Sequence, residues 1–278
     1  MPKLVANRYG KGRVRVLKVL RDGATHRIKD LNVTAMLTGD LESSYTAGDN
    51  SNVVPTDTIK NTVNALSHKH LGDEIERFGI VLGQHFVRFP QIKQAAIELL
   101  EHDWHRLDVN GRPHPHSFKS GGDARMFARV TATKQTHAVQ SGVRDLIILK
   151  STGSGFAGYP RDEFTTLKET SDRILGTSFS ATWDFSEDPG DYRVANNGIM
   201  TTMLEVFAEN YSPSAQTTLY QMGEAALDAC AGISRIELAM PNKHCLLIDL
   251  SPFGLVNKNE VFVPIEEPHG QIEATVAR

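Results

Sequence analysis

The segment Arg13–Leu37, RVRVLKVLRDGATHRIKDLNVTAML, decides the first part of the fold. Charged and apolar residues alternate over Arg13–Leu20, and this period of two is typical of a strand with one buried face. The tetrapeptide RDGA at Arg21–Ala24 favours a turn, and Ile28–Leu37 provides an apolar partner strand. The segment therefore predicts a β-hairpin near the start of the chain.

Two amphipathic helices are predicted after this hairpin. The tripeptide PTD at Pro55–Asp57 introduces the first, and its apolar residues recur at i, i+4 and i+7 as Ile59, Val63 and Leu66. The second helix has four apolar residues on one face, which are Ile75, Phe78, Leu82 and Phe86. The composition of the next segment, Ile92–Leu100, suits a short helix, whereas the alternation of Ile97 and Leu99 suits a strand. The residue pattern leaves both interpretations open. Met126–Thr133 alternates again and predicts a strand.

The second half of the chain repeats this order of strands, helices and strands. The predicted elements are strands at Val143–Leu149 and Ser178–Phe185, helices at Asn197–Glu209 and Ser214–Ala229, and strands at Ile236–Met240 and His244–Leu250. Strands grouped with strands favour antiparallel sheets with helices on one face, and they argue against an alternating βαβ fold. We therefore expect an α+β protein built from a duplicated unit.

Composition excludes several classes of protein. The chain has 278 residues, and its 30 Lys and Arg against 33 Asp and Glu leave a formal charge of −3, which excludes a large nucleic-acid-binding face. No apolar run approaches the roughly 20 residues of a membrane span, and the start of the chain lacks the apolar stretch of a secretory signal. Cys230 and Cys245 form no CxxC motif, so we expect buried thiols in a reducing compartment.

The sequence contains no complete phosphate-binding or metal-binding motif. The stretch KSTGSG at Lys150–Gly155 lacks the spacing of a phosphate loop, and no G-x-G-x-x-G precedes a helix. Four histidines have spacings that metal sites use, namely His102, His105, His114 and His116. No third ligand follows the His114–His116 pair at a recognisable interval. A metal-dependent enzyme built on these histidines stays an alternative, which a stoichiometric metal in elemental analysis would favour.

The most informative stretch is Leu146–Arg173, LIILKSTGSGFAGYPRDEFTTLKETSDR. It resembles the signature of the urate oxidase (uricase) family. Further segments resemble the same family in the same order along the chain, and they are Tyr9–Lys11, Gly48–Thr62, Gly111–Phe118, Ser214–Tyr220, Pro241–His244 and Ile272–Arg278. Each motif is short, but six of them in the expected order make coincidence a poor explanation.

The resemblance implies a tunnelling fold (T-fold), with two ββααββ modules whose antiparallel sheets carry helices on one face. The modules would span residues 1–135 and 136–278, and Ile92–Leu107 would be a strand. The family also implies a homotetramer with active sites between subunits, so that Lys11, Thr56 and Asp57 would face the other site residues across an interface. The C-terminal Val276-Ala277-Arg278 lacks the S-K-L address of peroxisomal members, which favours a bacterial-type cytoplasmic enzyme.

The resemblance also assigns a binding site for urate, a flat anionic purine. Phe156 would stack on the ring, an interaction worth roughly 1–3 kcal/mol by analogy with base stacking. Arg173 would present its planar donor fork to the anion, and the amide of Gln216 would read adjacent polar edges. The remaining substrate-binding positions implied by the family are Thr56, Asp57, Ala215 and Asn242.

The chemistry that the family implies needs no cofactor. Side chains do not supply electrons to O₂ easily, so a urate dianion would reduce O₂ itself and give 5-hydroxyisourate and hydrogen peroxide. Thr56 would remove the proton, because Lys11 accepts the proton of its hydroxyl. Asn242 and Thr56 would hold O₂ or water above the ring, and His244 would relay protons through a hydrogen bond toward Lys11 or Thr56.

Without the resemblance, each of these residues has an ordinary structural interpretation. Phe156 would pack in the core, Arg173 would pair with Glu169 on the surface, and Lys11 would be an exposed charge beside a strand. Thr56 would be a helix N-cap whose hydroxyl serves backbone N–H groups, and His244 would be structural. A purine-binding protein without turnover is a further alternative, although it would not need Lys11 and Thr56.

Overall fold

The computed structural model describes residues 2–278, which form two compact units. The first unit comprises Met1–Gly142 and Asp184–Asn196, and the second comprises Val143–Trp183 and Asn197–Arg278. The bounds differ from the expected modules because 184–196 packs on the first unit, where the amide of Asn196 donates to Glu76 at 2.7 Å. The division into modules 1–135 and 136–278 stays a prediction.

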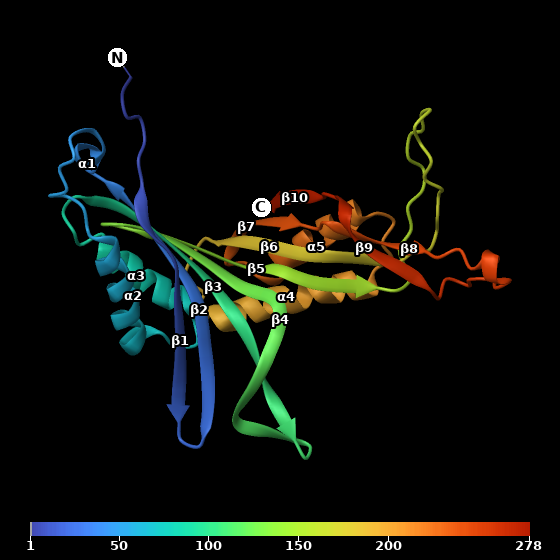
Figure 1. Cartoon of the computed structure of the whole chain (residues 1–278), viewed down its shortest axis with the longest axis horizontal. Coiled ribbons are helices and arrows are strands. Elements are labelled where there is room, and N and C mark those ends of the chain that lie inside the picture. Colours follow the sequence, from blue (N-terminus) through green and yellow to red (C-terminus); the bar gives the residue numbers. More distant parts are fainter. Residues whose placement is uncertain (1) are drawn as a thin grey trace. The chain divides into compact units, whose positions relative to one another are not determined.

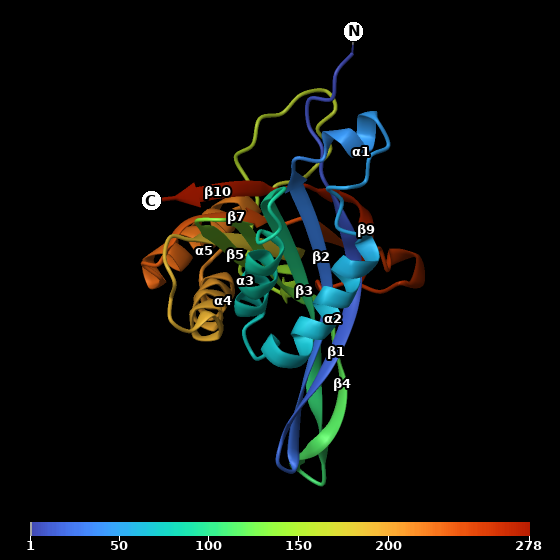
Figure 2. The same ribbon diagram turned by 90° about the vertical axis from the view of Figure 1, so that its left-hand side faces the viewer.

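The first unit contains an antiparallel sheet in the order β1-β2-β3-β4. Its elements are β1 (Tyr9–Asp22), β2 (Thr25–Gly39), α1 (Glu42–Thr46), α2 (Thr56–His70), α3 (Ile75–Phe86), β3 (Ile92–Val109) and β4 (Arg112–Thr133). The predicted N-terminal hairpin is confirmed, with Val16 opposite Leu31 in its register. The open choice at Ile92–Leu100 is resolved as strand, as the family resemblance implied. Figure 2 shows α2 and α3 against this sheet.

The core of the first unit lies between this sheet and the two helices. Ile59 and Val63 of α2 are fully buried, as are Phe78, Leu82 and Phe86 of α3, so the predicted apolar faces are confirmed. Gly79 and Gly83 let α3 lie close to the sheet, because an added Cβ would come within 2.8 Å of a methyl of Val130 or of the Ala132 Cβ.

The second unit is also antiparallel, with the strand order β5-β6-β7-β10. Its elements, some of which begin in or reach into the first unit, are β5 (His137–Lys150), β6 (Leu175–Phe185), α4 (Tyr192–Glu209), α5 (Ala215–Ala229), β7 (Ile233–Ala239), β8 (Asn242–Leu247), η1 (Ser251–Phe253), β9 (Phe262–Gly270) and β10 (Glu273–Ala277). All six predicted elements are present. Strands β9 and β10 were not predicted, and Pro264 and Pro268 in β9 are residues that argue against a central strand.

Lysine side chains close the C-terminal ends of two helices. Lys18 on β1 donates hydrogen bonds to the carbonyls of Ser67, His68 and Leu71 at 2.7–3.0 Å, at the end of α2. Lys150 on β5 does the same at the end of α4, where it donates to the carbonyls of Phe207 and Asn210. An ammonium group at this end of a helix satisfies unpaired carbonyls and complements the helix dipole. Both sheet–helix units therefore use a lysine on a strand to cap the C-terminal end of a helix.

The two cysteines are less buried than their sequence predicts. Cys230 and Cys245 are free but half-buried, so the expectation of buried thiols was wrong. Cys230 follows the last residue of α5, and Cys245 lies on β8 among partly exposed neighbours. Among the helices within residues 2–278, none has the length and hydropathy needed to cross a membrane.

Candidate active site

Lys11 lies on β1 immediately before a β-bulge. The pairing register of β1 and β2 shifts between Lys11 and Val14, and Arg13 has a φ of 54°. A bulge bends a strand and redirects the side chains beside it. Gly10 lets the strands approach closely at this point, because an added Cβ would overlap the carbonyl oxygen of Ala35. The backbone hydrogen-bonding pattern between β1 and β2 is therefore irregular next to Lys11.

Thr56 and Asp57 are the first two residues of α2. Pro55 is the N-cap, and its side chain makes no capping hydrogen bond, so the interpretation of Thr56 as an N-cap was wrong. Asp57 pairs with Lys60 and accepts a hydrogen bond from Asn61 at 2.9 Å. The hydrogen bond from Lys60 is the main reason that the pKa of Asp57 is lowered, and the charge of Lys11 adds to it. Lys11 therefore lies within electrostatic reach of the start of α2.

Tyr9 connects the strand of Lys11 to the segment that precedes Thr56. Its hydroxyl accepts a hydrogen bond from the amide of Val54 at 2.7 Å and donates one to the carbonyl of Val54 at 3.1 Å. Burial raises the pKa of the Tyr9 phenol, so it stays a neutral donor at ordinary pH. This double contact holds together the part of the site that lies in the first unit.

In the second unit, the chain forms a long loop between β5 and β6 (Figure 1). This loop brings Phe156 and Arg173 together. Phe156 and Thr170 exchange two backbone hydrogen bonds, of 2.8 and 3.0 Å, and the amide of Arg173 donates to the carbonyl of Ser154 at 2.7 Å. These bonds fold the loop back on itself. The guanidinium carbon of Arg173 consequently lies 5.2 Å from the centroid of the Phe156 ring.

Arg173 is a half-buried cation without an anionic partner. No carboxylate pairs with it among residues 2–278, and Glu169 instead accepts a hydrogen bond from the amide of Gly158 at 3.1 Å. The predicted alternative of a surface pair with Glu169 is therefore wrong. Burial lowers the pKa of Arg173, the nearby Tyr211 opposes this, and a guanidinium stays charged at neutral pH. Its Nε is buried without a hydrogen-bond partner, so the site favours an anion.

The Phe156 ring is half-buried and is not part of the hydrophobic core. It stacks on the ring of Tyr159, with centroids 4.9 Å apart and planes 15° from parallel. The hydroxyl of Tyr159 donates to the carbonyl of Leu167 at 2.8 Å, within the same loop. The loop thus presents aromatic surface beside a cation, which suits a flat anionic ligand.

Ala215 and Gln216 begin α5. Ser214 is the N-cap, and its hydroxyl accepts a hydrogen bond from the amide of Thr217 at 3.1 Å. Ala215 is buried, whereas the side chain of Gln216 is exposed and makes no hydrogen bond within residues 2–278. Residues 153–155 pair with Ser212 through two backbone hydrogen bonds of 2.8 and 2.9 Å. The start of α5 is therefore attached to the loop that carries Phe156.

Asn242 and His244 lie on β8. Asn242 is buried and stands opposite Thr177 of β6 and Gly270 of β9. His244 is half-buried, and neither side chain has a hydrogen-bond partner in the part of the chain that the structure describes. The expected hydrogen bond of His244 to Lys11 or Thr56 joins residues of different units and stays a prediction.

The four histidines of the metal alternative do not form one ligand group. His102 lies 3.0 Å from the amide nitrogen of Asn32, and His105 lies 3.2 Å from a carboxylate oxygen of Asp103. The rings of His114 and His116 meet edge to face at 4.5 Å. Residues 2–278 contain no group of three or more His, Cys, Asp or Glu side chains placed to hold a metal ion.

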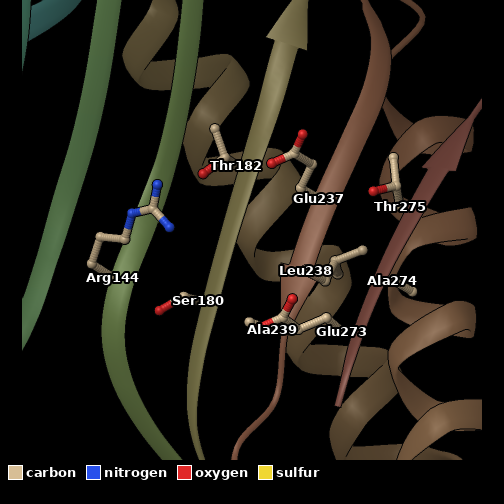
Figure 3. A pocket seen from close by; sticks show the side chains of 9 residues that line it. All are labelled: Arg144, Ser180, Thr182, Glu237, Leu238, Ala239, Glu273, Ala274 and Thr275. Carbon is tan, nitrogen blue, oxygen red and sulfur yellow. The ribbon is translucent and has the colours of Figure 1, made fainter. Parts of the chain in front are cut away.

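A separate hollow of about 490 Å³ lies on the sheet of the second unit (Figure 3). Its polar lining includes Arg144 of β5, Ser180 and Thr182 of β6, Glu237 of β7 and Glu273 of β10. None of the candidate site residues lines this hollow. Tyr9 and Ser154 lie in the quoted motifs, but no pattern in the sequence indicates a role for either. The contact of the Tyr9 hydroxyl with Val54 and that of the Ser154 carbonyl with Arg173 exist only in the folded chain.

Known proteins resemble this chain in both sequence and fold. A model of the uricase family matches residues 7–131 and 139–273. The chain is 41% identical over 273 residues to the uricase of Arthrobacter globiformis, covering 98% of this chain and 89% of that protein. It is 39% identical over 295 residues to the uricase of Aspergillus flavus, covering 100% and 98%. A crystal structure of the A. globiformis uricase matches with a TM-score of 0.94 at 41% identity, over 100% of this chain and 96% of that one. With this agreement in sequence and in fold along almost its whole length, the chain belongs to the uricase family.

Proposed function

We propose that this chain oxidises urate with O₂ and water to 5-hydroxyisourate and hydrogen peroxide. One observation carries the proposal beyond family membership. It is the half-buried guanidinium of Arg173, which has no anionic partner among residues 2–278 and lies 5.2 Å from the centroid of the Phe156 ring. An unpaired cation beside an aromatic face is suited to a planar anion, and urate is one.

Binding of urate would use groups from both units. Phe156 would stack on the purine, and Arg173 would donate two hydrogen bonds to a carbonyl oxygen and a deprotonated ring nitrogen. Gln216 would hydrogen-bond the adjacent edge, because its amide has no partner within residues 2–278. Ala215, Thr56 and Asp57 would complete the contacts, chiefly through backbone groups at the starts of α5 and α2.

The chemistry would begin with proton removal. Thr56 would take a proton from the urate monoanion as its own hydroxyl proton passes to Lys11. This role is open to Thr56 because its hydroxyl is not used to cap α2. The urate dianion then gives two electrons to O₂, which takes up two protons and leaves as hydrogen peroxide. Water adds to the oxidised purine to give 5-hydroxyisourate.

Asn242 and His244 would serve the oxygen and water steps. Asn242 is buried with an amide that no residue within 2–278 engages, so it could hold O₂ or water together with Thr56. His244 would relay protons, since imidazole titrates near neutral pH in general. No step in this scheme calls for electrons from the protein or from a bound cofactor.

The family suggests an assembly in which copies of the chain complete one another's sites. We propose a cytoplasmic homotetramer, in which Lys11, Thr56 and Asp57 of one copy face the Phe156 loop of another. Separation of the site residues into different units of the chain is compatible with this arrangement.

Urate-dependent oxygen uptake tests the proposed reaction, with peroxide measured in the same sample of chelator-treated protein. We expect uptake with one peroxide formed for each O₂ consumed. Activity that disappears on chelation, with a stoichiometric metal in elemental analysis, would favour the metal-dependent alternative. Binding of urate without any oxygen uptake would favour the purine-binding alternative.

A further inference from the structure

Ser154 is a buried hydroxyl with no hydrogen-bond partner. The residue Ser154 is fully buried. Its Oγ is one of four buried side-chain polar atoms that have no hydrogen-bond partner among residues 2–278. An unsatisfied buried hydroxyl destabilises a fold by roughly 1–3 kcal/mol. Alanine would avoid that cost at little change in volume, so a serine at this position calls for a functional reason.

The second unsatisfied atom beside Ser154 is the Nε of Arg173. The two residues are directly adjacent, because the amide of Arg173 donates to the carbonyl of Ser154 at 2.7 Å. Nε–H is a donor and a serine hydroxyl is an acceptor. A hydrogen bond between them would satisfy both atoms at once.

The position of the guanidinium explains why this bond is absent. Arg173 leans over the Phe156 ring, with a distance of 5.2 Å from its guanidinium carbon to the ring centroid. An anion stacked on Phe156 would compete for that ring face and draw the guanidinium toward its own oxygen. The arginine would then turn, and Nε could meet Ser154.

We propose that Ser154 is a positioning residue for Arg173, accepting a hydrogen bond from its Nε when a planar anion occupies the site. This inference rests on the proposed function, because the anion is taken to be urate. Ser154 would hold the guanidinium edge-on to the ligand, so that both terminal nitrogens face it. Ligand binding would thereby satisfy two buried polar atoms that have no hydrogen-bond partner within residues 2–278.

Binding and catalysis should separate in the variant Ser154→Ala. We expect the dissociation constant for urate, measured by calorimetry without O₂ so that no turnover occurs, to rise about 10- to 100-fold, as for loss of one hydrogen bond to a charged group. We expect kcat at saturating urate to stay within about twofold. The unfolding temperature should not fall, because alanine removes an unsatisfied hydroxyl. Ser154→Cys, which retains the volume but is a weak acceptor, should weaken binding in the same direction.

Thr218→Val is the matched control in the same neighbourhood. Thr218 is equally buried, but its hydroxyl donates to Ser212 at 2.6 Å, so the variant should lose stability and keep its affinity for urate. Unchanged affinity in Ser154→Ala would overturn the inference, as would a loss of affinity that accompanies a fall in unfolding temperature. If the wild-type chain itself does not bind urate, both the proposed function and this inference are wrong. Normal wild-type binding with normal Ser154→Ala binding overturns the inference alone.

Discussion

At the scale of single residues, several of the polar candidate side chains have no partner within residues 2–278, although Asp57 pairs with Lys60. Lys11, Gln216 and His244 have no side-chain hydrogen bond within residues 2–278. Most polar side chains near buried structure are paired. Thr56 belongs to the same group because Pro55, and not Thr56, precedes α2 as its N-cap. Unpaired polar groups of this kind are available to bind a ligand, and in the proposed site they would act together with the ring of Phe156 and the guanidinium of Arg173.

Substitution of Lys11 and Arg173 should separate proton removal from binding. We expect Lys11→Met to lower kcat by about 10²- to 10⁴-fold with little change in urate affinity, because a general base acts in the transition state. Arg173→Ala should chiefly weaken binding, and Arg173→Lys should recover it only in part, since lysine lacks the planar fork. Steady-state oxygen uptake and anaerobic calorimetry measure the two effects. The reverse pattern would contradict the assigned roles, and Lys69→Met on an exposed helix end is the control.

At the scale of elements, one buried carboxylate joins three strands of the first unit. Asp30 on β2 is almost fully buried and accepts two hydrogen bonds of 2.6 Å from Arg15 on β1. It also accepts one of 2.9 Å from the indole of Trp104 on β3. Burial alone would raise the pKa of Asp30, but these hydrogen bonds outweigh it and lower the pKa. The sheet that carries Lys11 therefore depends on an ionised aspartate.

Asp30 should make the stability of the protein depend on pH in mild acid. Because the folded-state pKa is lowered, its stabilisation is complete above the ordinary value near 3.9 and is lost as the pH falls through the folded-state value. Asp30→Asn should lower the free energy of unfolding by about 1–3 kcal/mol at pH 7. Arg15 is about half exposed, so solvent screening limits the effect.

Urea unfolding between pH 7 and pH 3 measures this difference. The advantage of the wild type over Asp30→Asn should shrink below about pH 4, where the protonated aspartate resembles the amide. The exposed Asp228, replaced by Asn, is the control and should change stability little at any pH. A difference between wild type and Asp30→Asn that is independent of pH would refute this account.

Lys18 should contribute to stability through the end of α2. Lys18→Met removes three hydrogen bonds to carbonyls while keeping most of the apolar stem, so we expect a loss of about 1–3 kcal/mol in the free energy of unfolding. Lys69→Met, in the last turn of the same helix, should stay within about 0.5 kcal/mol of the wild type. Equal effects of the two substitutions in thermal unfolding would argue against the capping role.

At the scale of the whole molecule, the candidate residues fall into two groups that lie in different units. Lys11, Thr56 and Asp57 belong to the first unit, and Phe156, Arg173, Ala215, Gln216, Asn242 and His244 belong to the second. In the proposed mechanism the first group would supply the base, and the second would supply the aromatic face, the cation and the relay. The proposed site would need both groups, and the proposed tetramer would bring them together from different copies.

Mixed oligomers test this arrangement. Lys11→Met and Arg173→Ala chains should each have low activity, yet co-expression should restore about a quarter of the wild-type rate. Random pairing across a two-fold interface makes half of the dimers mixed, and each mixed dimer has one intact site out of two. Assays of the co-purified mixture at saturating urate, beside each variant expressed alone, provide the comparison. Absence of any recovery would mean that both groups come from the same copy.

Short-range patterns were sufficient for most of the fold. The alternation in Arg13–Leu20 and the spacing of Ile59 and Val63 depend only on which face of an element is buried, and the structure confirms both. Strands β9 and β10 escaped prediction because their pairing partners, β8 and β7, determine them. In addition, β9 contains Pro264 and Pro268, and β10 is only five residues long. The bounds of the compact units likewise depend on the packing of residues 184–196 with the first unit. No local sequence pattern predicts that packing.

The identity of the candidate residues was available from the sequence, because ordered motifs specify which side chains a family uses. Which atoms lie unpaired was a matter for the tertiary structure alone. Pro55 rather than Thr56 caps α2, Glu169 turns away from Arg173, and Ser154 meets Arg173 through the backbone. All three features depend on contacts between particular groups. The folded loop or helix end sets the distances between these groups, and their spacing along the chain does not.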